Sequence, residues 1–160
     1  PADALQMNGE KNATRLGAAL KLLIMLENGT KTTKGKRISH GELLELLQKH
    51  PGLKRSAGRY TNGRRILQPS VITVLHYLFA LKDMAAADDF FDKLLNGTSL
   101  APLDPILTLR NKLIENSLKS QKYDRDSLLV YTIMAWNGWR RGDKMAYIRK
   151  PAHPGFPPII

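Results

Sequence analysis

The chain has 160 residues and an apolar content of 42%, which fits one domain with its own core and excludes general disorder. It contains no cysteine, so disulfide bonds and thiolate metal sites are excluded. Its net charge of +11 favours a polyanionic partner such as nucleic acid, because each neutralised phosphate releases condensed counterions.

The sequence shows no membrane or secretion signal. The longest apolar run, Leu20–Leu26, is interrupted by Lys21 and is far shorter than the roughly 18 residues needed to cross a bilayer. Pro1–Met7 has neither the basic residues nor the apolar core of a signal peptide. We therefore expect a cytoplasmic protein that does not enter a membrane.

The positive charge is concentrated in two blocks. Residues 30–65 carry a net charge of +8 and residues 110–150 carry +6, whereas residues 66–109 between them carry −3. Residues 1–29 are neutral. Such a split predicts one or more basic surfaces rather than an evenly charged molecule.

The first half of the chain predicts helices separated by basic loops. Apolar residues at helical spacing mark a helix from Asn12 to Glu27, facing inward with Leu16, Leu20, Leu23 and Ile24 and ending at Asn28-Gly29. Thr30–Arg37 is a polar basic loop. A capping-box pattern at Ser39–Glu42 opens a helix over 42–50, which Pro51-Gly52 ends. Residues 53–63 predict a short helix and then a loop.

The central helices are predicted from their apolar patterns. Val71–Lys82 is almost continuously apolar and is expected at the centre of the fold. Ala85–Leu95 reads as an acidic amphipathic helix closed by Asn96-Gly97.

Capping residues mark the ends of the last two helices. Asp104 is an expected N-cap with Pro105 at the first helical position. Asp124 or Asp126 begins the final helix, which ends near Gly142. The proline-containing tail after it excludes helix but is too apolar for a solvated linker, so it is expected to lie extended on the helical core, a neighbouring chain or a further domain.

These patterns predict an all-α protein of about six helices and no strand. The expected organisation is an N-terminal segment (1–11), a single compact helical domain (12–142) and an extended C-terminal tail (143–160).

The basic residues of the first half are the predicted nucleic-acid contacts. They form an arm and a second cluster, with Tyr60 and Asn62 available for stacking and base-edge hydrogen bonds; the nine cations are Lys31, Lys34, Lys36, Arg37, Lys54, Arg55, Arg59, Arg64 and Arg65. Ser39–Arg59 also allows a helix-turn-helix interpretation, although Gly58 and Gly63 weaken its second helix.

The sequence contains no recognisable catalytic or metal-binding motif, so we predict no catalytic residue, metal site or cofactor. His76 lies in the most apolar helix and is interpreted as a hydrogen-bonded core residue. Asp88, Asp89 and Asp92 are in the first turns of a helix, where the dipole favours negative charge. The competing hypothesis is that these carboxylates hold a hard cation, as in a nuclease.

The final helix contains both tryptophans. Leu129, Ile133 and Trp136 form one apolar stripe, so Trp136 is predicted to be buried and Trp139 to be partly exposed under the tail. Asn137 is predicted to make a structural hydrogen bond to the chain leaving Gly142. The alternative is that the tryptophans stack nucleic-acid bases.

Three segments and the proline-broken end carry a family resemblance. FFDKLLNGTSL (90–100), DPILTLRNKL (104–113), MAWNGWRRG (134–142) and the later Gly-Phe-Pro resemble the C-terminal helical region of phage and plasmid ParB-like proteins, which have a D-P-I-x-x-L-R element and an A-W-N-x-x-R-x-G element. The resemblance extends loosely from Asn12 to the end.

The resemblance implies a DNA-related accessory domain and transfers no catalytic residue. A ParB/sulfiredoxin-like domain normally precedes this region, and nothing before Asn12 resembles its G-x-x-R-x-x-A signature. The chain is therefore either a fragment or a stand-alone protein.

Two functions remain open from the sequence. The leading hypothesis is a non-enzymatic DNA-binding or DNA-associated domain that uses its basic surface. The alternative is a protein assembly module that meets a protein partner or a second copy through the C-terminal tail.

Overall fold

The structure, a computed structural model, describes residues 10–28, 40–59, 66–152 and 155–160. All regular structure in these residues is helical, which confirms the all-α prediction. They contain seven helices where the sequence predicts about six: α2 (Glu10–Asn28), α3 (His40–Lys49), α4 (Gly52–Arg59), α5 (Pro69–Lys82), α6 (Met84–Asn96), α7 (Pro105–Leu118) and α8 (Arg125–Arg141). Within the described ranges no helix is both long and apolar enough to cross a membrane.

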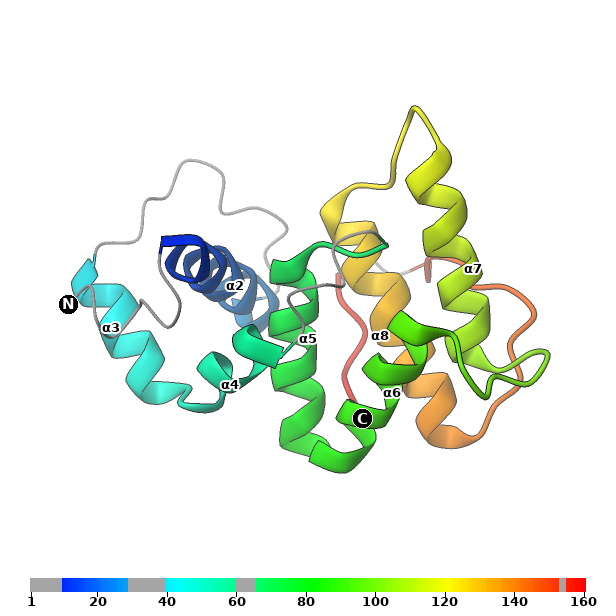
Figure 1. The fold of residues 1–160 in the computed structure, drawn as a ribbon, viewed down its shortest axis with the longest axis horizontal. Helices are drawn as coiled ribbons and strands as arrows, with labels where there is room; N and C mark the ends of the chain where they lie inside the picture. The colour runs from blue at the N-terminus through cyan, green and yellow to red at the C-terminus, as the bar shows by residue number, and fades with distance from the viewer. Residues whose placement is uncertain (1–9, 29–39, 60–65, 153–154) are drawn as a thin grey trace.

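Helix α5 is the centre of the fold, as its apolar sequence predicts. It packs against α2 and α4 on one side and against α6 and α8 on the other, and Figure 1 shows it between these two groups of helices. The side chains from Val71 to Tyr77 are all buried, together with Phe79. This element therefore joins the N-terminal and C-terminal halves through one core.

The first helix faces the core with more of its surface than a single stripe predicts. Leu16, Leu20 and Leu23 are buried as expected, but Ile24 is only half-buried, and Leu22 and Met25 are buried instead. The reason is that α2 contacts α3, α4 and α5, so partners surround it on several sides.

The predicted helix ends at the C-terminal half are confirmed. The Asp104 side chain accepts a hydrogen bond from the Ile106 amide, with Pro105 at the first position of α7. Asp124, rather than Asp126, caps α8 by accepting from the Ser127 amide. Gly97 and Gly142 end α6 and α8 in the left-handed conformation.

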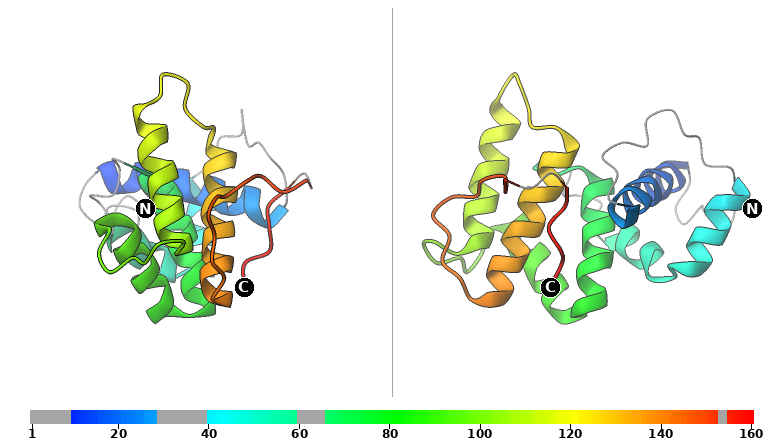
Figure 2. Two further views of the ribbon diagram at one scale, coloured as in Figure 1. Left: turned by 90° about the vertical axis from the view of Figure 1, so that its right-hand side faces the viewer. Right: turned by 180° about the vertical axis from the view of Figure 1, so that it is seen from behind.

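The C-terminal tail (residues 143–160) contains no helix in its described residues, 143–152 and 155–160, and lies on its own chain. The Met145 amide donates to the Leu103 carbonyl, and Ile148 is buried against the core. The final residues run beside α8 and α5, which is visible in Figure 2 from behind. The tail thus crosses the helical core of the same molecule, one of the arrangements that its sequence allows.

Candidate nucleic-acid interface

Only a small part of the predicted basic site falls within the described residues. Lys31, Lys34, Lys36, Arg37, Arg64 and Arg65 lie outside the described residues. Arg59 is the last residue of α4, but its side chain is not described. The two remaining cations lie on α4, with Lys54 half-buried and Arg55 exposed. Of the nine predicted cations, the structure therefore describes only the side chains of Lys54 and Arg55, both on α4.

Helix α4 is held by one apolar face that sets the direction of its cations. Leu53, Ser56 and Ala57 are buried, and the helix packs mainly against α5 and α2. The closest packing of α3 is against α2, so α3 and α4 rest on other helices rather than mainly on each other. On the opposite side of α4, the Arg55 guanidinium lies 3.7 Å from the Met84 sulfur.

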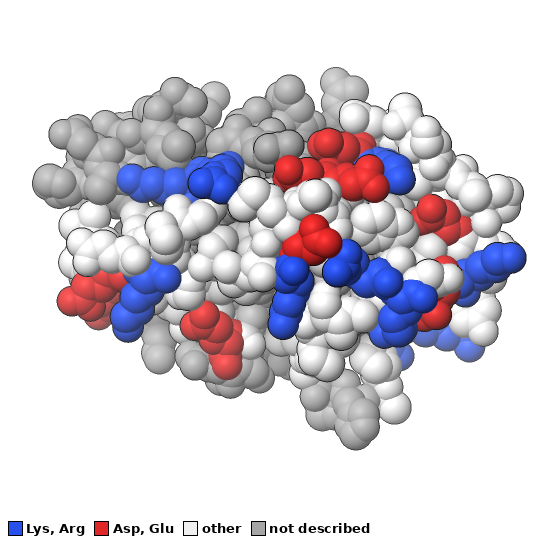
Figure 3. Space-filling model, turned by 90° about the horizontal axis from the view of Figure 1, so that it is seen from below, with Lys and Arg blue, Asp and Glu red and all other residues white. Residues whose placement is uncertain are grey.

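The face below α5, α6 and α8 carries charges of both signs. Arg140 lies 3.2 Å from Asp83, Lys93 lies 3.1 Å from Asp89, and Arg141 lies 2.9 Å from Asp143. Figure 3 shows Lys and Arg side chains interleaved with Asp and Glu on this face. Such pairing leaves little net field for a polyanion.

A second basic region, which the sequence prediction missed, lies on α7 and the loop that follows it. The Lys112 ammonium is 4.4 Å from the centre of the Tyr131 ring and 5.1 Å from that of Tyr123. The Lys119 ammonium is 5.2 Å from the centre of Tyr123. Lys112 and Lys119 are two helical turns apart, and this spacing is the signal that predicts a shared face.

The loop after α7 is fixed by one buried amide. The Asn116 side-chain oxygen accepts a hydrogen bond of 2.7 Å from the Tyr123 amide. Tyr123 then packs edge-on against Tyr131, with ring centres 5.3 Å apart. Lys119, Lys122 and Arg125 are exposed around this aromatic pair.

The same side of α7 also faces an exposed tyrosine of the tail. Tyr147 is 63% exposed, and the Arg149 guanidinium lies 4.4 Å from its ring centre. Tyr147 and Lys112 both line a hollow of about 270 Å³, together with Thr108, Asn111 and Glu115 of α7. An exposed aromatic ring beside cations is the combination that binds bases and phosphates of single strands.

We call this set the α7 surface: Lys112, Lys119, Lys122, Tyr123, Arg125, Tyr147 and Arg149. Among the described residues, none of its five cations lies within ion-pair distance of a carboxylate. Glu115, Asp124 and Asp126 are the acidic residues on the neighbouring turns, and Asp124 is engaged as the α8 N-cap.

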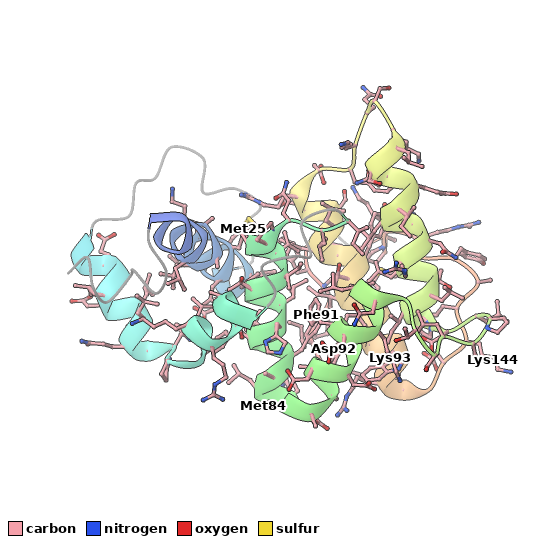
Figure 4. The ribbon with its side chains drawn as sticks, viewed as in Figure 1. Met25, Met84, Phe91, Asp92, Lys93 and Lys144 are labelled. Atoms are coloured by element: carbon pink, nitrogen blue, oxygen red, sulfur yellow. The ribbon has the colours of Figure 1, made fainter. Side chains whose placement is uncertain are left out.

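The α7 surface is connected to the N-terminal half at Arg125. Its guanidinium lies 3.9 Å from the sulfur of Met25, which Figure 4 labels on α2. Helix α2 ends at Asn28, and the sequence continues directly into the predicted basic arm, residues 31–37.

His76 is a hydrogen-bonded core residue, as predicted. It is 2% exposed, with Nδ1 2.8 Å from the Ser56 hydroxyl and Nε2 2.8 Å from the Asp88 carboxylate. The three residue types are those of a hydrolase triad, but Ser56 is only 3% exposed and no substrate carbonyl reaches it without rearrangement of α4 and α5. The geometry accounts for a satisfied polar group in an apolar core.

The three carboxylates of α6 are not gathered at one point. Asp88 bonds to His76, and Asp89 pairs with Lys93 on the next turn. Within the described ranges, no three His, Asp or Glu residues are arranged to hold a metal ion.

The A-W-N signature on α8 holds the tail. Trp136 is fully buried, stacked on Phe79 at 4.3 Å between ring centres, and its Nε1 donates to the Ile160 carbonyl at 2.9 Å. The Asn137 side chain donates to the Pro158 carbonyl at 2.7 Å and accepts from the Ile160 amide at 3.1 Å. Trp139 is partly exposed, as predicted. The full burial of Trp136 confirms that it packs in the core.

Gly138 of the same signature leaves room for the tail. A Cβ at this position would lie 2.5 Å from the Met145 sulfur. The glycine therefore lets the first part of the tail approach the α8 backbone closely.

Comparison of the chain with family models, curated proteins and solved structures finds no match.

Proposed function

We propose that this chain is a non-enzymatic nucleic-acid-binding domain whose partner is DNA. The observation that carries the proposal is the α7 surface, where cations without a carboxylate partner among the described residues lie beside the half-buried Tyr123 and the exposed Tyr147. Cations supply phosphate contacts, and tyrosine rings supply stacking that is tolerant of sequence.

The predicted basic arm and cluster extend this proposal to the N-terminal half. The arm follows α2, whose Met25 contacts Arg125 of the α7 surface. The arm, the cluster from Lys54 to Arg65 and the α7 surface together hold 14 of the 25 lysine and arginine residues. Contacts of this kind bind phosphate without reading sequence.

The ParB-like resemblance suggests the context in which such a domain acts. An accessory domain beside a ParB-like domain of a phage or plasmid protein needs DNA affinity but no catalytic residue of its own. The signature that carries the resemblance packs the tail, so the proposed DNA contacts come from other residues.

A salt titration of DNA binding tests the proposal. Binding of labelled duplex and of single-stranded DNA of the same sequence is measured by fluorescence anisotropy at several salt concentrations. If about four cations neutralise phosphates, the slope of log K against log salt is about −3 to −4. Tighter binding of the single strand indicates that the tyrosines stack bases. Absence of binding to both DNAs at low salt contradicts the proposal.

A charge-reversed variant tests the predicted cluster separately. Arg64→Glu/Arg65→Glu is expected to weaken binding equally for DNAs of unrelated sequence, because phosphate contacts carry no base information. Unequal weakening would instead assign these residues to base recognition. Unchanged binding would remove the cluster from the interface and leave the α7 surface.

A further inference from the structure

The last residues of the tail are recognised through their backbone. Asn137 contacts the Pro158 carbonyl and the Ile160 amide, and Trp136 contacts the Ile160 carbonyl. We call these two side chains the tail clamp. Every tail atom in these three hydrogen bonds is a main-chain atom. The same segment of another copy of the chain offers the same atoms to the clamp.

The connection that leads to the clamp is loosely held in its first part, whereas Phe156 near its end packs against the core. Arg149, Lys150, Pro151 and Ala152 are all exposed. In the described part of residues 149–157, no hydrogen bond joins the connection to the helices. The segment also contains Pro151, Pro154 and Pro157. Proline-rich chain is stiff, and nine such residues span about 28 Å at about 3.1 Å each, enough to reach a neighbouring molecule.

The return of the tail onto its own α8 needs a special backbone conformation. Gly155 has φ of +117°, which side-chain-bearing residues rarely adopt. A short, stiff connection that must turn back on itself favours exchange between molecules, because exchange keeps the docking contacts and releases the turn.

The side of the molecule around the clamp is also incompletely covered. A hollow of about 500 Å³ lies between α8 and the tail, lined mainly by apolar side chains such as Met134, Met145 and Phe156. Nearby, Leu103, whose carbonyl binds the Met145 amide, is 46% exposed, and Ile160 is 43% exposed. Apolar surface of this kind is stabilised when another molecule covers it.

We propose that two copies of this chain exchange their tails, so that the clamp of each copy holds residues 158–160 of the other. The contacts are those of the single molecule, and the new interface covers the hollow beside the clamp. Four of the five cations of the α7 surface lie outside the exchanged segment, and only Arg149 belongs to the connection.

Mixing two variants of the full chain tests the exchange. Asn137→Ala breaks the clamp but keeps the tail intact, whereas Ile160→Pro removes the amide that binds Asn137 and keeps the clamp intact. Analytical ultracentrifugation is expected to show a concentration-dependent dimer for the wild type. Each variant alone is expected to keep a dimer dissociation constant close to that of the wild type, because the same contacts are lost from its closed monomer and from its exchanged dimer.

The mixture distinguishes exchange from docking within one molecule. The mixed dimer has one intact clamp, formed by the Ile160→Pro copy and the tail of the Asn137→Ala copy, so it should be tighter than either dimer of a single variant. A mixture that behaves as the average of the two variants contradicts the proposal. So does a wild type that stays monomeric.

Cysteine pairs give a second test that needs no broken contact, because the chain has no cysteine of its own. Met134 and Ile160 both line the hollow. A Met134→Cys protein mixed with an Ile160→Cys protein should form a disulfide-linked dimer under oxidation. The control partner is Leu118→Cys, which is 83% exposed at the end of α7. Equal yields from the two mixtures would show random collision and overturn the exchange.

Discussion

Trp136 is the largest fully buried side chain of the protein's described residues and lies at the centre of an aromatic cluster. Its ring is fully buried, stacks on Phe79 with planes 8° apart and meets Phe90 edge-on. Trp136→Ala is therefore expected to lower the free energy of unfolding by roughly 3–5 kcal/mol, as for other large core aromatics. Urea unfolding followed by circular dichroism measures this loss.

Trp139→Ala is the matched control for that substitution. Trp139 contacts Phe90 but is partly exposed, so its removal should cost clearly less stability. A Trp136→Ala protein that is as stable as the wild type but no longer binds DNA would assign the tryptophan to binding instead of packing.

The hydrogen bonds of Asp83 predict that the free energy of unfolding depends on pH. The Ala86 amide and then the Arg140 guanidinium hold the pKa of this carboxyl below its ordinary value of 3.8. The folded chain therefore binds fewer protons here than the unfolded chain. The stabilisation is present above pH 3.8 and is lost as pH falls through the lowered pKa.

Asp83→Asn separates this effect from general acid unfolding, since asparagine still caps a helix but carries no charge. We expect the wild type to be more stable than the variant at neutral pH and the difference to shrink below pH 3.8. Urea unfolding at each pH measures the difference. A difference that does not change with pH contradicts this account.

At the scale of elements, the end of α6 depends on Gly97 and Arg110. Gly97 has φ of +70°, and a Cβ there would lie 2.6 Å from the Arg110 Nε. Arg110 itself donates to the Leu94 and Leu95 carbonyls at the end of α6. Gly97→Ala must therefore strain the backbone and displace these bonds, a combined cost of roughly 2–4 kcal/mol.

Gly142 provides the control for the backbone part of that cost. It has φ of +76°, but nothing lies within 4 Å of an added Cβ. Gly142→Ala should then cost only about 1–2 kcal/mol from the left-handed conformation. Thermal or urea unfolding of both variants makes the comparison, and equal losses would mean that Arg110 does not secure the end of α6.

The helices themselves were largely predictable, because the residues that begin and end each helix lie next to it in the sequence. Asp104-Pro105, Asp124, Gly97 and Gly142 each act within one turn of their own position. The start of the second helix differs, because α3 begins at His40 and the predicted start was Glu42. The suggested capping residue Ser39 lies outside the described residues.

At the scale of the whole molecule, contacts between distant segments were harder to predict. The hydrogen bond from Asn137 to the chain after Gly142 was expected, but its partners Pro158 and Ile160 were not specified by any local pattern. Likewise, Lys112 and Tyr147 are 35 positions apart and meet only because the tail folds beside α7. The net charge of +6 on residues 110–150 was evident from the sequence. The arrangement of these residues as the α7 surface was not.

Two matched double variants test the proposed DNA interface most directly. Lys119→Ala/Lys122→Ala removes two charges from the α7 surface. Lys93→Ala/Lys144→Ala removes the same charge elsewhere, and Figure 4 shows both lysines low in the view, away from the free end of the α7–α8 hairpin. DNA affinity is measured for both by fluorescence anisotropy across a salt series. The first pair should weaken binding about tenfold and make the salt slope shallower by about 2, with a much smaller effect from the second. Equal losses, or a larger loss from the Lys93/Lys144 pair, would contradict binding through the α7 surface.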